Sequence, residues 1–267
     1  MQATDWSSYA AVYDMIQAYN PAYQDLVARF EAEVRGWSLP SGRPIVDVGA
    51  GTGVFSLGWA RAFPDHPVVH VEPDPGMNAV AARKARAAGL GNVRIAARGV
   101  DDADVAPGSA AAVSCVHALY TFPDPPAALA RLHAWLAPGG RAFLCDPGRP
   151  VDVWEWSRFL AGHLVRTVGP VGAARVFWRG RETWRQNRRI RRAQLDGTYW
   201  THSPEAFRAA VEAADFEVER VETCFRGYSD LVVARRPLGG AGAGRQRPDR
   251  RGGTIAAGPT GCMRATR

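Results

Sequence analysis

Lysine is almost absent from this chain of 267 residues, in which Lys84 stands alone beside 32 arginines. Proteins that bind nucleic acid usually concentrate basic side chains in one patch or stripe of the folded domain. Here the net charge is +7, but six arginines and one aspartate from residue 238 onward carry +5 of it, which leaves +2 for residues 1–237. In an alanine-rich chain this arginine excess indicates a GC-rich genome, and no nucleic-acid partner is expected.

Long apolar runs and paired cysteines are lacking as well. No stretch approaches the roughly 20 apolar residues of a membrane span, so no membrane partner is expected. The first ten residues, MQATDWSSYA, have neither the basic nor the apolar region of a secretory signal. We expect a cytoplasmic protein with reduced thiols, because no paired spacing links the four cysteines, Cys115, Cys145, Cys224 and Cys262.

Strand-like and helix-like segments alternate through the first half of the chain. With 46% hydrophobic residues the chain can bury one sizeable core. Such alternation is typical of βαβ units, in which helices cover both faces of a parallel sheet. The expected strands lie near residues 44–49, 68–72, 92–96, 110–116 and 140–146, and the expected helices near 7–19, 21–36, 53–63, 75–88 and 125–136.

The second half departs from this rhythm. Residues 151–200 form a Trp- and Arg-rich helical insertion, after which a helix at 203–214 precedes two strands, 216–225 and 228–235, joined as a hairpin. Residues 238–267 have too few large apolar groups to pack and are predicted to be a disordered basic tail. We therefore expect one domain over residues 1–237, in which a core at 40–146 is covered by a helical lid from 5–36 and 151–200.

A glycine-rich loop marks the first candidate site. In IVDVGAGTGVFSLGWARAF, residues 45–63, three glycines separate a buried strand from an amphipathic helix. Unpaired N–H groups at the helix start, together with glycines that admit a ligand close to the main chain, suit a nucleotide-like ligand. A dinucleotide site would carry a third glycine where this chain has Val54, which argues against a pyrophosphate. Glu72 ends the next strand, where a carboxylate can accept hydrogen bonds from both ribose hydroxyls.

These segments resemble a known family. VDVGAGTG followed by VEPDPGM is similar to the first and second motifs of the class I S-adenosylmethionine-dependent methyltransferases, and residues 109–149 resemble their fourth strand, the next helix and the Leu-x-Pro-Gly-Gly turn into the fifth strand. The resemblance covers residues 40–150 and, by pattern, 203–235. It implies a Rossmann-like α/β fold with a mostly parallel seven-stranded sheet, a C-terminal β-hairpin and a helical lid, and S-adenosylmethionine as the cofactor.

The resemblance also implies a set of cofactor-binding residues. Asp47, Gly49 and Gly51 would hold the methionine portion, Glu72 the ribose and residues 99–102 the adenine. Because the chain reads Gly-Val-Asp where relatives often have Gly-Asp, the acid that contacts the adenine is either Asp101 or Asp102. Ala111 stands where many relatives have an aspartate, and Met77 packs either on the adenine or in the core. The implied set is Asp47, Gly49, Ala50, Gly51, Glu72, Pro73, Met77, Val100, Asp101 and Cys115.

The acceptor site can be predicted only in outline. Methyl transfer needs the acceptor aligned about 3 Å from the methyl carbon and shielded from water. In the family this site lies beyond the carboxyl ends of the fourth and fifth strands. His117 ends the fourth strand and is a candidate general base with an ordinary pKa near 6.5, or else a structural residue. Tyr120 and Tyr13 are the other catalytic candidates, or else only shape the pocket.

The insertion supplies further candidates. Treated as one helix, residues 174–195 place three polar side chains, Asn187, Arg191 and Gln194, on an otherwise apolar face. Buried polar groups need partners, and a carboxylate or phosphate on the acceptor would suit Arg191. Alternatively, the helix is a solvated basic cover. The full set of substrate candidates is Tyr9, Asp146, Asn187, Arg191, Gln194, Tyr199 and His202.

We therefore predict methyl transfer from S-adenosylmethionine to a small molecule of specialised metabolism. No Asn-Pro-Pro-Tyr signature is present, and Asp146 has no acidic neighbour after the fifth strand to help hold Mg²⁺, so no metal is expected. One alternative is an enzyme that uses the sulfonium without methyl transfer, through intramolecular displacement or cyclisation of the cofactor or of a substrate. Another is a non-catalytic cofactor-binding module, against which the intact glycine loop and Glu72 argue. The acceptor atom and the oligomeric state stay open.

Overall fold

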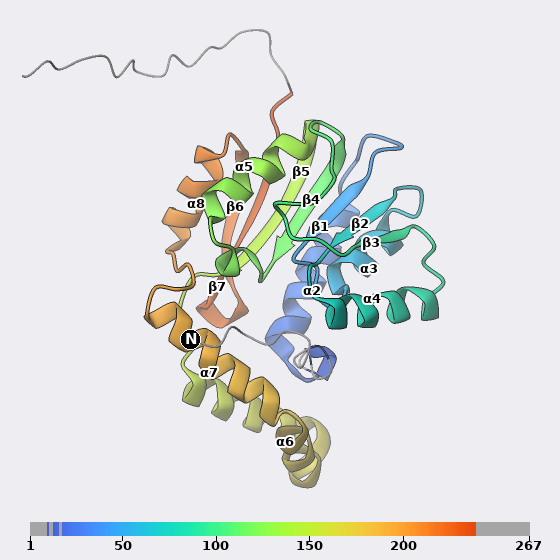
Figure 1. The fold of residues 1–267 in the computed structure, drawn as a ribbon. Coiled ribbons are helices and arrows are strands. Elements are labelled where there is room, and N and C mark those ends of the chain that lie inside the picture. The colour runs from blue at the N-terminus through green and yellow to red at the C-terminus, as the bar shows by residue number, and fades with distance from the viewer. Residues whose placement is uncertain (1–9, 11–12, 16–17, 239–267) are drawn as a thin grey trace, which may run out of the picture.

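The computed structural model describes residues 10, 13–15 and 18–238, which contain one seven-stranded sheet in the order β3-β2-β1-β4-β5-β7-β6 (Figure 1). Neighbouring strands are parallel except that β7 runs antiparallel to both β5 and β6. The predicted mostly parallel sheet with a C-terminal hairpin is therefore confirmed. The strands are β1 Ile45–Val48, β2 Val68–Val71, β3 Val93–Ala96, β4 Ala110–Val116, β5 Leu136–Pro147, β6 Glu217–Cys224 and β7 Ser229–Arg235.

Side-chain caps fix where most of the helices begin. Four of them start with a proline after a residue whose side chain accepts a backbone N–H, as when Asn20 accepts from Ala22 at 3.0 Å. The others capped in this way are α4 Pro75–Ala87, α5 Pro125–Trp135 and α8 Pro204–Ala213, with Asp74, Asp124 and Ser203 as caps. The helix that opens this series is α2 Pro21–Arg35, and the glycine loop leads directly into α3 Val54–Ala62.

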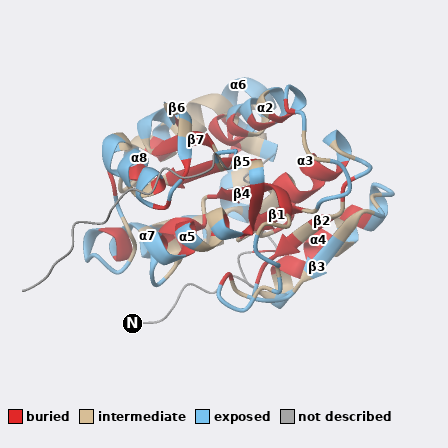
Figure 2. Cartoon of the chain, turned by 90° about the horizontal axis from the view of Figure 1, so that it is seen from above, coloured by how far each residue is buried: buried red, intermediate tan, exposed pale blue. Residues whose placement is uncertain are grey.

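Alternate residues of the strands pack into two separate core layers. In β1, Val46 and Val48 face the layer that contains residues of α5 and α8, whereas Ile45 faces the layer built on α2 and α3. Helices therefore cover both faces, and Figure 2 shows the buried sheet between helices whose outer sides are exposed. Because the period of a strand is two, this alternation also decides which polar residues of the strands can reach a ligand.

The insertion folds as two helices, α6 Val153–Arg179 and α7 Arg181–Leu195, which lie together beyond one end of the sheet (Figure 1). The single helix predicted over residues 174–195 is therefore wrong at Gly180, which ends α6 and caps α7. Glycine is a poor helix former, so a break there costs little. A second break lies inside α6 at Gly169, which has a φ of 74° and is followed by Pro170.

Some predictions fall partly or wholly outside the described residues. Of the helix predicted at residues 7–19, residues 10, 13–15 and 18–19 are described and helical. Tyr9 lies outside the described residues, and so does the predicted disordered tail apart from Leu238. Within the described part of the chain, every helix is too short or too polar to cross a membrane.

Candidate functional site

The strand order reverses between β1 and β4, where ligands bind in doubly wound sheets. Three predicted features meet at this point: the glycine loop after β1, Glu72 after β2 and His117 after β4. They line a small cavity of ≈ 120 Å³. The topology therefore brings together segments that are up to 68 residues apart in the chain.

Two glycines of the loop serve different purposes. Gly49 has a φ of 62°, and a Cβ built there would lie 2.2 Å from the Cβ of Ala118. Gly51 has a φ of 55°, but a Cβ there would meet no described atom within 4 Å. Gly49 thus allows the loop to pack against the segment after β4, while Gly51 leaves open space on the cavity wall that a ligand can fill.

Glu72 connects the loop to the end of β2. Its carboxylate accepts hydrogen bonds from the backbone N–H of Gly51 at 3.0 Å and of Asp74 at 2.9 Å. The side chain is buried, and this burial raises the pKa of Glu72 despite the two bonds. Two carboxylate oxygens offer about four acceptor positions, so capacity remains on the cavity side for further donors such as ribose hydroxyls.

Asp47 lies beneath the loop and does not line the small cavity. Its two oxygens accept hydrogen bonds from the hydroxyls of Ser56 and Ser114, each at 2.6 Å. Burial raises the pKa of Asp47 to about 6. Because alternate residues of β1 face opposite layers, the Asp47 side chain points toward α3 and braces the start of the loop from below.

Three other predicted cofactor residues also lie away from the cavity walls. Cys115 and Val100 are buried in the layer beneath α5, and burial raises the pKa of the Cys115 thiol well above its usual value. Asp101 is exposed and pairs with Arg131 at 3.2 Å. The predicted residues that do line the small cavity are Gly49, Ala50, Gly51, Glu72, Pro73 and Met77.

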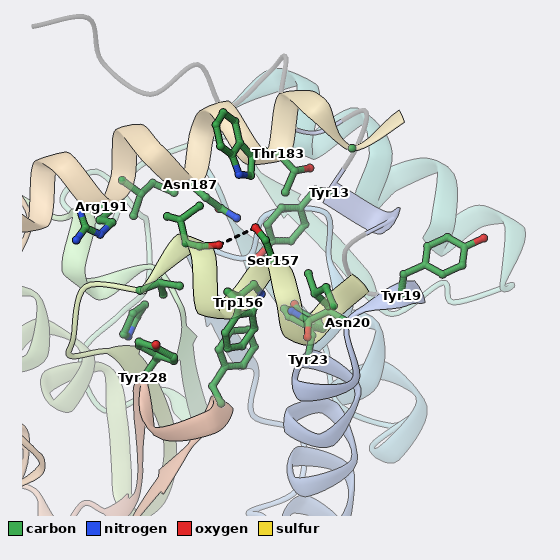
Figure 3. Close-up of a pocket in the computed structure, with 18 of the residues that line it drawn as sticks. Tyr13, Tyr19, Asn20, Tyr23, Trp156, Ser157, Thr183, Asn187, Arg191 and Tyr228 are labelled. Carbon is green, nitrogen blue, oxygen red and sulfur yellow. Dashed lines mark hydrogen bonds between the residues drawn. The ribbon is translucent and has the colours of Figure 1, made fainter. Parts of the chain in front are cut away.

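A larger cavity of ≈ 710 Å³ lies beside the first, between the lid helices, the N-terminal segment and the hairpin turn (Figure 3). Most of its wall is aromatic or aliphatic, with Tyr23 and Trp156 among the residues labelled in the figure. Tyr13, Tyr23 and His117 line both cavities, so these three side chains stand where the two meet. Sequence reasoning missed Tyr23, whose position depends on how α2 packs against the sheet.

His117 occupies this junction in an uncommon conformation. Its φ is 53°, its Nε2 lies 3.0 Å from the Ser229 Oγ, and its ring packs edge-on against Phe225 with centroids 4.7 Å apart. Burial lowers the pKa of His117 to about 4, so the ordinary value expected from the sequence is wrong. The imidazole is therefore neutral near pH 7 and can accept a hydrogen bond or a proton.

The two other catalytic candidates also line the larger cavity. Burial raises the pKa of Tyr13 to about 12, so its phenol stays protonated near pH 7. Tyr120 is buried and packs edge-to-face against Tyr199, with ring centroids 5.3 Å apart. Tyr199 lines neither cavity, and in the structure its ring contacts that of Tyr120.

Asp146 and His202 belong to a buried ionic cluster behind the cavity wall. Asp146 lies opposite Asp230 in the β5–β7 pair, and His202 lies 3.7 Å from the first carboxylate and 3.4 Å from the second. Burial raises the pKa of Asp146 to about 6. For His202, burial opposes the charge, but the two carboxylates outweigh it and raise its pKa. Arg149 completes the cluster through two bonds to Asp230, at 2.6 and 2.9 Å.

This cluster corrects two expectations. Asp146 is alone after β5 in the sequence but has Asp230 as an acidic neighbour in space. Both Asp146 and His202 were expected to contact the substrate, yet neither lines the larger cavity, whereas the adjacent Pro147 and Ser229 do. The cluster therefore holds the ends of β5 and β7 together beneath the cavity.

The structure is a doubly wound α/β domain with one cavity at the switch point of the sheet and a larger cavity beside it. Within that class, the chain belongs to the methyltransferase family, because the family model described as "Methyltransferase domain" matches residues 15–221. No sequence among the curated proteins matches this chain.

Solved structures share the fold at low sequence identity. A putative S-adenosyl-L-methionine-dependent methyltransferase from Methanococcus maripaludis is 14% identical, with a TM-score of 0.58 over 90% of this chain and 98% of its own. A SAM dependent methyltransferase from Aquifex aeolicus is 15% identical, with a TM-score of 0.55 over 86% and 98%. Geranyl diphosphate C-methyltransferase from Streptomyces coelicolor A3(2), in complex with S-adenosyl-L-homocysteine, is 14% identical, with a TM-score of 0.54 over 79% and 76%. Together with the family match, these structures support S-adenosylmethionine as the cofactor.

Proposed function

We propose that this protein transfers a methyl group from S-adenosylmethionine to a small molecule in a biosynthetic, specialised-metabolism reaction of the cytoplasm. The observation that carries the proposal is the junction of a nucleotide-type cavity with a larger apolar one at Tyr13, Tyr23 and His117. When bound, S-adenosylmethionine supplies an electrophilic methyl group on a sulfonium. The neighbours that act on geranyl diphosphate, a small molecule with an apolar chain, are consistent with an apolar acceptor.

The residues of the small cavity fit this cofactor. Gly51 leaves room at the main chain, Glu72 offers acceptors for ribose hydroxyls, and Met77 presents a buried apolar side chain. The volume of ≈ 120 Å³ is smaller than the roughly 300 Å³ at which small-molecule sites begin. A whole nucleoside therefore needs more space than the described walls of the small cavity leave.

His117 can serve the acceptor without opposing the cofactor. Because its pKa is about 4, the ring is uncharged near pH 7 and does not repel a cation held beside it. A neutral imidazole can take the proton that an acceptor hydroxyl or amine loses as its new bond forms. Ser229 orients the ring through Nε2, and the surrounding aromatic rings exclude water.

The first test is cofactor binding. Calorimetry should show that the wild type binds S-adenosylhomocysteine and that Glu72→Gln binds it about 10- to 100-fold more weakly, because charge-assisted hydrogen bonds are lost. Glu222→Gln is the matched control, since Glu222 forms ion pairs with Arg29 and Arg220 on the surface. Equal affinity of the two variants would remove Glu72 from the ribose site, and a wild type without affinity would refute the proposed function.

A second prediction concerns Asp14, whose contacts join the N-terminal segment to the glycine loop and to α4. Asp14, next to Tyr13, accepts hydrogen bonds from Thr52 Oγ1 at 2.8 Å and from Lys84 Nζ at 2.9 Å. Asp14→Leu removes both contacts, so we expect stopped-flow fluorescence to show severalfold faster release of S-adenosylhomocysteine. The control is Asp25→Leu, which removes an exposed ion pair with Arg29. If both variants release the ligand at the wild-type rate, the contacts of Asp14 do not slow ligand release.

A further inference from the structure

A ladder of polar side chains runs along the face of α7 that lines the larger cavity. It consists of Thr183, Asn187, Arg191 and Gln194, which follow one another at intervals of four, four and three residues. Figure 3 shows the first three in this order along the helix. Helical neighbours at these intervals lie on one face, so the ladder presents one continuous polar strip to an otherwise largely apolar space.

Gln194 is the buried end of this ladder. The residue is only 5% exposed, and neither Oε1 nor Nε2 has a hydrogen-bond partner among the described residues. The hydroxyl of Thr183 is likewise buried without such a partner. A buried amide with no partner costs stability, whereas a ligand that offers a donor and an acceptor side by side would satisfy it.

Arg191 adds a positive charge three residues before Gln194. Two other arginines of α7 are already engaged, since Arg185 pairs with Glu182 and Arg188 lies over the ring of Trp184, whereas Arg189 and Arg192 do not line the cavity. Arg191 has no hydrogen bond or ion pair with any described residue. Its charge lowers the pKa of Asp152, whose carboxylate is nevertheless bonded to backbone N–H groups at the start of α6.

We infer that the acceptor is an amphipathic carboxylic acid. Its apolar body would fill the aromatic part of the larger cavity, and its carboxylate would bind the Arg191 guanidinium and the Nε2 amide of Gln194. The Oε1 atom of Gln194 would then accept a hydrogen bond from a hydroxyl or N–H group near that carboxylate. One unengaged guanidinium beside an amide suits a planar anion with one charge better than a phosphate with nearly two. The inference rests on the proposed function, because it takes the larger cavity as the acceptor site.

Four probes with one skeleton test the inference: 4-phenylbutanoate, 4-phenylbutanamide, 4-phenylbutan-1-ol and 4-phenylbutyl phosphate. Each is titrated calorimetrically into protein saturated with S-adenosylhomocysteine. We expect the wild type to bind the acid at least tenfold more tightly than the alcohol. Arg191→Met should remove that preference and leave the affinity for the alcohol unchanged. Gln194→Leu should weaken the binding of both the acid and the amide.

Arg189→Met is the matched control, because Arg189 lies on the same helix and is exposed like Arg191, but does not line the cavity. It should bind all four probes as the wild type does, and all variants should melt within a few degrees of one another. Equal binding of acid and alcohol by the wild type, tighter binding of the phosphate than of the acid, or equal behaviour of the two arginine variants would overturn the inference. A wild type that does not bind S-adenosylhomocysteine would instead count against the proposed function, because cofactor binding is titrated separately from the four probes.

Discussion

Gly49→Ala should lose about 3 kcal/mol or more of its free energy of unfolding, from the sum of steric overpacking and a left-handed backbone. The added Cβ would lie 2.2 Å from the Cβ of Ala118, and the φ of 62° would be kept only at a cost. The glycine loop and the segment after β4 would have to move apart. Urea denaturation followed by circular dichroism measures the loss, which is a large part of the 5–15 kcal/mol typical of domains.

Gly51→Ala is the matched control for this steric argument. It shares the left-handed backbone, with a φ of 55°, but its Cβ meets no described atom within 4 Å. We expect a stability loss of about 1–2 kcal/mol from backbone strain alone. The methyl group would enter the space left for the cofactor. At a low temperature, where both variants are folded, the affinity for S-adenosylhomocysteine should therefore be lower in Gly51→Ala than in Gly49→Ala. Equal loss of stability in the two variants would show that the contact with Ala118 does not matter.

Local chemistry made much of the fold and of the small cavity predictable. The caps at Asn20 and Ser203 mark helix starts because a side-chain oxygen must satisfy a backbone N–H there. Glycines in a strand-to-helix turn and an acid after the next strand suit a nucleotide-like ligand, so Gly51 and Glu72 could be identified, and both lie on the cavity wall. The face of α7 also followed from helical periodicity, although the break at Gly180 did not.

The remaining site residues depend on contacts between distant segments. The sequence motif identifies Asp47 but not the hydroxyls of Ser56 and Ser114 that occupy its oxygens. Cys145 and Cys224 are 79 residues apart and have no recognisable spacing, yet their sulfurs lie 3.6 Å apart. Such pairs arise from strand register and helix packing, which a single sequence does not specify.

The change with the largest expected effect on the rate is His117→Asn. Removing a general base typically costs 10²- to 10⁴-fold, so methyl transfer from labelled S-adenosylmethionine to a component of cell extract should slow by at least about 10²-fold. Asparagine tolerates the left-handed φ of 53° that the backbone adopts at this position. The fold should therefore be kept, and affinity for S-adenosylhomocysteine should stay within about twofold of the wild type.

The pH dependence of the wild-type rate gives an independent check on His117. A base acts in its neutral form, and burial lowers the pKa of His117 to about 4. The rate should therefore be flat from pH 8 down to about 5 and fall only as the ring becomes protonated near pH 4. A histidine with an ordinary pKa near 6.5 would instead lose half of the rate at about pH 6.5 and nearly all of it by about pH 5. His163→Asn is the control, because His163 lies on α6 and lines neither cavity. A midpoint near pH 6.5 in the wild type, or equal rates in the two histidine variants, would exclude His117 as the base.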